Sequence, residues 1–192
     1  ESAAAAKKAA AEELQSAIIT AATTAYDTAK VGPELVAHIA AMEVKPTGAT
    51  LLSQIFTKNT EAKNMKWISK AAYGAALQSL LEDKTTDQVL AVYEVQRFCH
   101  TLEFPKIDVK GEKRALIEII YQLMYQNDII DNDGFTSWAD DDVYDSIPGK
   151  TNALVQATKF ITFLKTEEES EEEEESEEED EEAMMGGANF IK

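Results

Sequence analysis

The amino-acid sequence predicts an all-α protein that ends in a strongly acidic tail. Apolar residues recur at spacings of three and four along most of the 192 residues, which is the pattern of helices with one buried face. With only 8 glycines and 4 prolines, the chain has few residues that interrupt helices. No stretch of linker composition divides residues 1–166, so we expect one helical domain there and a disordered tail at residues 167–192.

Four helices are expected in the first half of the chain, over residues 3–30, 33–44, 49–58 and 64–81. Gly32 and Pro33 end the first and begin the second, because proline suits the first turn of a helix and cannot continue one. A turn at residues 45–48 precedes the third helix. The fourth has apolar residues on one face, which we expect to be buried: Met65, Ile68, Ala72, Ala76 and Leu80.

Three further helices are expected, over residues 85–103, 112–126 and 151–166. Thr85 or Thr86 is the candidate N-cap of the first, and Pro105 marks its end. The inward stripe of this helix is formed by Ala91, Val95, Phe98 and Leu102. The second has an apolar face so wide that we expect it at the centre, after a short basic loop, and no segment is expected to form a strand. Successive antiparallel helix pairs predict an α-solenoid.

The net charge of -18 is concentrated in the tail. Residues 167–182 contain 14 of the 36 acidic residues, and Lys192 is the only base after Lys165, so residues 1–166 carry a net charge of only about -5. A polyanionic tail repels phosphate groups, so we expect no direct binding of nucleic acid by this segment. Its natural complement is a lysine-rich protein.

Two serines in the tail are candidate phosphorylation sites. Ser170 and Ser176 are each followed by glutamates, which is the context of acid-directed phosphorylation. Phosphate groups there would add to the negative charge that the tail already carries.

The chain has no arrangement of residues typical of an active site. Cys99 is the only cysteine, which excludes an internal disulfide and a thiolate metal cluster and fits a reducing compartment. It adjoins His100, but neighbouring side chains on a helix point about 100° apart and are poorly placed to act as nucleophile and base. Cys99 is expected to be a small buried side chain, and His38 an ordinary histidine with a hydrogen-bond partner. We therefore expect no catalysis and no cofactor; an enzyme that depends on Cys99 or His100 is the weakest alternative.

The segment from Asp131 to Gly134 resembles part of a calcium-binding loop, but its spacing does not fit. If Gly134 is counted as the sixth position, the first position falls on Ile129, which cannot bind a cation. The twelfth falls on Asp140 instead of a glutamate. No metal site is therefore expected. No apolar stretch approaches the roughly 20 residues of a membrane span, so we expect no contact with a membrane. The single cysteine makes cytoplasm or nucleus the default location, and we expect the cytoplasm.

Aromatic residues among carboxylates are the most informative feature of the chain. Residues 128–142 read DIIDNDGFTSWADDD, in which Phe135 and Trp138 share one helix face while aspartates surround them. Phe160 and Phe163 similarly precede a run of glutamates. Such rings are either part of the core, or part of a surface that binds lysine-rich segments by charge and by cation–π contact. Both interpretations can hold, because a buried ring can position the acids.

These segments resemble a known family. The stretches AVYEVQRFCHTLEFPK, ALIEIIYQLMYQNDIIDNDGFTSWADDD and GKTNALVQATKFITFLKTEEESEEE resemble the two-tryptophan domain that ends several eukaryotic translation initiation factors. The residues before them look most like the version in initiation factor 4 gamma, and the resemblance covers most of residues 49–175. It implies an atypical HEAT-like stack of antiparallel helix pairs without enzymatic activity. It also implies two aromatic-acidic boxes that bind basic segments of other initiation factors or, in some scaffold proteins, a protein kinase.

The resemblance assigns partner-binding residues to the two boxes. The first box comprises Asp131, Asp133, Phe135, Trp138 and Asp140, with Asp141 and Asp142 adjoining. The second comprises Phe160, Phe163, Glu167, Glu168 and Glu169. Phe163 stands where the family has its second tryptophan, so the apolar anchor should remain while the indole N–H donor is lost.

Three functional hypotheses follow. The leading one is a docking domain of a 4 gamma-type scaffold that captures lysine-rich segments of other initiation factors. The second is the equivalent domain of initiation factor 5 or of the epsilon subunit of initiation factor 2B. The third is a chaperone of basic proteins that uses its polyglutamate tail, with the helical body as a mere scaffold.

Overall fold

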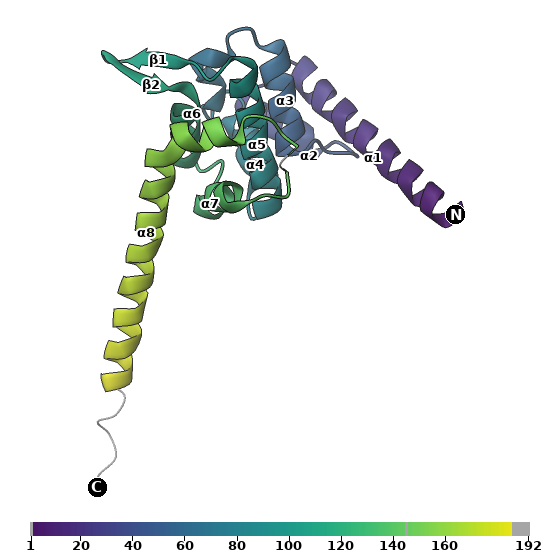
Figure 1. The fold of residues 1–192 in the computed structure, drawn as a ribbon. Helices are drawn as coiled ribbons and strands as arrows, with labels where there is room; N and C mark the ends of the chain where they lie inside the picture. Colours follow the sequence, from purple (N-terminus) through teal and green to yellow (C-terminus); the bar gives the residue numbers. More distant parts are fainter. Residues whose placement is uncertain (1, 145, 186–192) are drawn as a thin grey trace.

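The structure is a computed structural model that describes residues 2–144 and 146–185, with the side chains of residues 4–144 and 146–167 (Figure 1). Its α-helices are α1 (Ser2–Asp27), α2 (Gly32–Ala40), α3 (Gly48–Lys58), α4 (Gly74–Leu81), α5 (Thr85–Thr101), α6 (Leu116–Gln126), α7 (Asn132–Asp140) and α8 (Lys150–Met185). Two 3-10 turns, η1 (Ala62–Asn64) and η2 (Lys66–Ile68), precede α4, and the strands are β1 (Lys106–Val109) and β2 (Glu112–Ala115). The predicted all-α fold is confirmed.

Helices two apart in the sequence lie against each other. Helix α3 packs on α1 and α5, α5 packs on α7, α2 packs on α4, and α6 packs on α8. This alternation is how two stacked rows of antiparallel helices assemble in a HEAT-like solenoid. Helix α5 lies at the centre, since it also contacts α4 and α6 and buries eight residues, including Gln88, Tyr93 and Gln96. The central position expected for residues 112–126 is thus shared with α5.

A small hairpin interrupts the helices, where no strand was expected. Strands β1 and β2 pair antiparallel, with Val109 opposite Glu112. Lys110 and Gly111 form the turn with φ of 55° and 88°, and the Gly111 N–H donates to Asp108 Oδ1 at 2.9 Å. Helix α6 therefore begins at Leu116, four residues later than expected.

The expected helix over residues 64–81 is correct only in its second half. Met65 has a φ of 60°, so the chain changes direction there and makes two short 3-10 turns before α4 begins at Gly74. The Trp67 indole N–H donates to the Ala62 carbonyl at 2.9 Å within the core. A Cβ on Gly74 would lie 2.0 Å from the Ile68 carbonyl oxygen, so this packing requires glycine.

Helix α8 has no end at residue 166. Its backbone continues to Met185 through the glutamate run, and Figure 1 shows this half projecting away from the other helices. Glutamate has a high helix propensity, although like charges four residues apart repel each other. The domain boundary at residue 166 and the disorder of residues 167–192 stay predictions; residues 186–192 lie outside the described residues.

Candidate functional site

Helix α7 carries the first aromatic-acidic box. Asp131 is its N-cap, and its carboxylate Oδ1 accepts the backbone N–H of Gly134 at 3.0 Å. The helix turns Phe135 and Trp138 inward, where both rings are completely buried. Asp133 and Asp140 remain exposed on the other side. The predicted combination of inward rings and outward carboxylates is therefore present in the fold.

The rings of the first box belong to the core. Trp138 donates its indole N–H to Gln96 Oε1 at 3.0 Å and packs edge-on against Tyr121, with the ring centroids 5.2 Å apart. Phe135 lies 5.1 Å from the ring of Phe160, which belongs to the second box. Because both rings are sealed inside, a partner can reach the aspartates but not the ring faces. The structure thus supports the interpretation in which buried rings position the acids.

Two buried glutamines anchor the box to α5. The Gln88 side chain accepts the Asp131 backbone N–H at 3.1 Å and donates to Asp131 Oδ2 at 2.8 Å. The Gln96 amide accepts from Trp138 and donates to the Pro148 carbonyl at 2.9 Å. Neither glutamine was predicted as a site residue. A signal was present, since Gln88 lies three residues before Ala91 on the predicted inward stripe, and a buried amide needs hydrogen-bond partners.

The carboxylates of the first box are unequally held. Asp140 makes an ion pair with Lys165 of α8 at 3.1 Å, with both side chains largely exposed. Asp141 accepts the hydroxyl of Tyr93 at 2.6 Å, and this hydrogen bond is the main reason that the pKa of Asp141 is lowered. Asp142 is exposed to solvent. These groups offer negative charge at the C-terminal end of α7.

The second box is only partly formed as expected. Phe160 is buried and continues the aromatic core, whereas the side chain of Phe163 is 48% exposed. Position 163 is therefore a surface position in this chain and not an apolar anchor. Glu167 accepts the hydroxyl of Tyr125 at 3.0 Å. The side chains of Glu168, Glu169, Ser170 and Ser176 lie outside the described residues.

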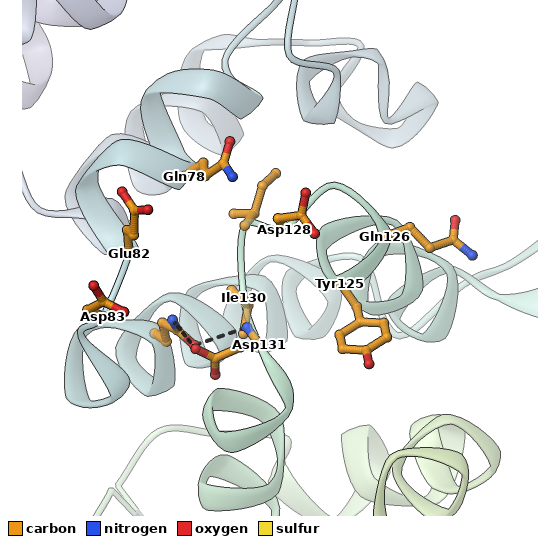
Figure 2. Close-up of a pocket in the computed structure, with 10 residues that line it drawn as sticks. Gln78, Glu82, Asp83, Tyr125, Gln126, Asp128, Ile130 and Asp131 are labelled. Atoms are coloured by element: carbon orange, nitrogen blue, oxygen red, sulfur yellow. Dashed lines mark hydrogen bonds between the residues drawn. The ribbon is translucent and has the colours of Figure 1, made fainter. Parts of the chain in front are cut away.

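An acidic pocket opens beside Asp131 (Figure 2). It has a volume of about 460 Å³ and lies between the end of α4 and the loop from α6 to α7. Figure 2 shows Glu82 and Asp83 on one side and Asp128 on the opposite side. Ile129 and Ile130 also line it, although both side chains are almost completely buried. The pocket thus gathers several carboxylates, although Glu82 and Asp83 were not predicted as site residues.

Cys99, His38 and the segment that resembles a calcium-binding loop were the remaining candidates. Cys99 is buried, and burial raises its pKa to about 12, so almost no thiolate exists at neutral pH. His38 is half-buried, and its Nε2 atom lacks the expected hydrogen-bond partner. Ile129 lies in the core and α7 replaces the loop that calcium ligation would need. Among the described residues, no helix has the length and apolar character needed to cross a bilayer.

Comparisons with known proteins place these features in a family. The sequence model of the family described as "W2: eIF4-gamma/eIF5/eIF2-epsilon" matches residues 87–182, which include both boxes. The chain is also similar to Eukaryotic translation initiation factor 4 gamma 2 of Mus musculus and of Homo sapiens, with 31% identity over 97 residues. This alignment covers 50% of the chain but only 10% of each of these relatives.

Proposed function

Because this chain belongs to the W2 family of eIF4-gamma, eIF5 and eIF2-epsilon, a family that mediates binding to other translation factors, we propose that it docks a lysine-rich segment of another initiation factor. The parent protein in this proposal is a scaffold of the 4 gamma type that acts in the cytoplasm. The W2 domains of factor 5 and of factor 2B epsilon are the alternative parents, and a protein kinase is the alternative partner.

The observation that carries the proposal is the separation of rings and charges in the first box. Phe135 and Trp138 are sealed in the core, while Asp140 and Asp142 lie on the surface above them. A carboxylate held by a folded helix, such as Asp140 on α7, loses little backbone freedom when it binds a cation, which favours association with a lysine-rich segment. The partner in this proposal is recognised by charge, and the rings supply the rigidity.

The acidic pocket gives one lysine of the partner a specific place. A lysine side chain has an apolar stem and a charged tip, and it binds well where apolar walls meet carboxylates. The half-buried side chain of Tyr125 lines the pocket and offers such apolar surface, and Glu82 and Asp83 line it as well. The ion pair of Asp128 with Lys70 at 3.3 Å is exposed and therefore contributes little that an incoming lysine would have to replace.

A binding experiment with isosteric amides tests the proposal. A variant with Glu82→Gln, Asp83→Asn, Asp140→Asn and Asp142→Asn keeps the rings and the fold but removes four charges. We expect it to bind a fluorescent lysine-rich peptide between about fourfold and several-hundredfold more weakly, since each of the four exposed ion pairs contributes roughly 0.2–1 kcal/mol. Fluorescence anisotropy at constant ionic strength measures the affinity. Replacement of Trp138 is a poorer test, because the indole is buried and hydrogen-bonded.

The matched control removes four exposed charges elsewhere in the described structure. These are Glu13, Glu34, Glu43 and Glu112, in α1, α2, the loop after α2 and β2, each replaced with Gln. We expect this variant to bind nearly as the unmodified protein does. Equally weak binding by both variants would show that the interaction depends only on net charge and not on the positions of these carboxylates. Failure of the unmodified protein to bind the peptide would refute the proposed function.

A further inference from the structure

The ammonium group of Lys150, the first residue of α8, lies over two aromatic rings, that of Trp138 in the first box and that of Tyr93 in α5. Its Nζ atom is 4.5 Å from the ring centroid of Trp138 and 4.7 Å from that of Tyr93. Distances of this size are within the range of cation–π attraction, which is strongest when the cation is partly desolvated. A cation–π contact with a lysine of a partner was expected at the rings of the box. At the ring of Trp138, a lysine of the chain itself makes this contact.

The position of Lys150 is electrostatically unfavourable for its own helix. The N-terminal end of a helix carries partial positive charge, so a lysine in the first turn of α8 is repelled by the helix dipole. Interactions outside α8 must offset this repulsion. The two rings and the neighbouring oxygen atoms provide them.

Lys150 instead stabilises the C-terminal end of another helix, α7. Its Nζ donates to the backbone carbonyl of Trp138 and to that of Asp141 at 3.3 Å. Both carbonyls lie at the C-terminal end of α7, where helix carbonyls lack partners and carry partial negative charge. The cation thereby caps α7 and fixes the segment that begins at Asp140.

The same ammonium group determines the direction of a hydrogen bond to Asp141. Its Nζ lies 3.0 Å from the Tyr93 hydroxyl oxygen, and an ammonium group can only donate. The Tyr93 oxygen must therefore accept from Lys150, which leaves the hydroxyl hydrogen free to point to Asp141 Oδ2 at 2.6 Å. Lys150, Tyr93 and Asp141 form a directed chain that orients one carboxylate of the box.

We propose that Lys150 is an internal ligand of the first aromatic-acidic box. It is a positioning residue whose ammonium group covers the ring of Trp138 and orients Asp141 through Tyr93. The assignment does not depend on whether a partner binds. One consequence does rest on the proposed function. A lysine of the partner binds the carboxylates of the box and not the ring of Trp138, because Lys150 already covers that ring.

Chemical rescue of a truncated side chain tests the assignment. In Lys150→Ala, the melting temperature should fall by several degrees, and the carboxyl resonance of Asp141 should titrate closer to the ordinary aspartate pKa of 3.8. Added n-butylammonium should restore both quantities at least in part, because it resupplies the stem and the charge. The uncharged n-butanol, which resupplies only the stem, should restore neither. Lys159→Ala, an exposed position of the same helix, is the matched control and should change neither quantity.

Two results would overturn the assignment. Equal restoration by n-butanol would show that the stem of Lys150 only fills space. An Asp141 titration that is the same in Lys150→Ala as in the unmodified protein would show that the lysine does not act on the carboxylate. If Lys150→Ala does not fold, the unmodified protein decides: ring currents of Trp138 and Tyr93 should move the Lys150 Hε resonances upfield of those of Lys159, and coincident resonances would refute the assignment.

Discussion

At the scale of single residues, the buried thiol of Cys99 predicts a reactivity that depends on unfolding. Burial raises the pKa of Cys99 from 9.0 to about 12, so the folded state disfavours the thiolate. Below pH 9 the thiol is neutral in both states, and stability is lost as pH rises from 9 towards 12 because the unfolded state then ionises first. Alkylation by iodoacetamide at pH 8 should be slow without denaturant and should follow the unfolded fraction in urea. Rapid alkylation of the native protein would contradict this burial.

Gly134 shows why a glycine can matter without a special backbone angle. A Cβ at this position would lie 2.4 Å from Gln88 Oε1 and 2.8 Å from Ile130 Cγ2. Gly134→Ala should therefore cost roughly 1–3 kcal/mol of unfolding free energy, because overpacking displaces the amide that holds Asp131. Urea unfolding measures this cost. Ser137→Ala, at an exposed position of α7, is the control and should be almost neutral; a similar result for both would disprove the close packing.

Among single residues, the sequence predicted the members of the first box but not their supports. Phe135 and Trp138 stand out because they alternate with aspartates in one short segment. Gln96 and Lys150 reach the same rings from α5 and from the start of α8, and only folding brings them together. Local pattern reveals which residues belong to α7, whereas tertiary contacts determine which of their surfaces remain accessible. The exposure of Phe163 could not be predicted for the same reason.

At the scale of elements, Asp131 has two separable tasks in α7. It caps the helix through Gly134, and it accepts a hydrogen bond from Gln88. Asp131→Asn can keep the cap but places an amide near the donor of Gln88, whereas Asp131→Ala loses both contacts. We expect Asp131→Ala to cost at least about 1 kcal/mol, typical of a lost N-cap, and Asp131→Asn to cost less. Thermal unfolding followed by circular dichroism compares them, and an Asn variant less stable than the Ala variant would contradict this ranking.

The two misassigned segments, the hairpin and the break near Met65, were missed for different physical reasons. Strands β1 and β2 are four residues each, largely polar and at the surface, so their alternation is too short to stand out, although Lys110 and Gly111 already indicated a turn. The break near Met65, where φ is 60°, has no local signal, because the turn is closed by a contact within the core, the hydrogen bond from the buried Trp67 indole to the Ala62 carbonyl. Long helices with a regular apolar face, such as α5, were predictable because their burial repeats along the sequence.

At the scale of the whole molecule, alternate helices pack on one another, and the acidic residues concentrate near the C-terminal end of the sequence. Helices α5 to α8 contain both boxes and coincide with the part that matches the family model. The solenoid could be anticipated because successive amphipathic helices have few other ways to bury their faces. The pocket beside Asp131 could not, because it arises where α4 and α6 make little contact with each other.

The acidic run and the box should contribute to binding in different ways. Removal of residues 168–192 spares Glu167, which Tyr125 holds at 3.0 Å, and so leaves the described contacts of the body intact. We expect this deletion to slow association with the lysine-rich peptide, because electrostatic steering raises on-rates by roughly 10–10³-fold, and to weaken the dependence of that rate on salt. Loss of the exposed carboxylates at positions 82, 83, 140 and 142 should also slow association, but it should in addition speed dissociation, because contacts made in the complex determine its lifetime. Stopped-flow kinetics at several ionic strengths separates the two effects. A chaperone of basic proteins that relies on its tail would behave in the opposite way, since deletion would abolish binding and the amide variant would retain it.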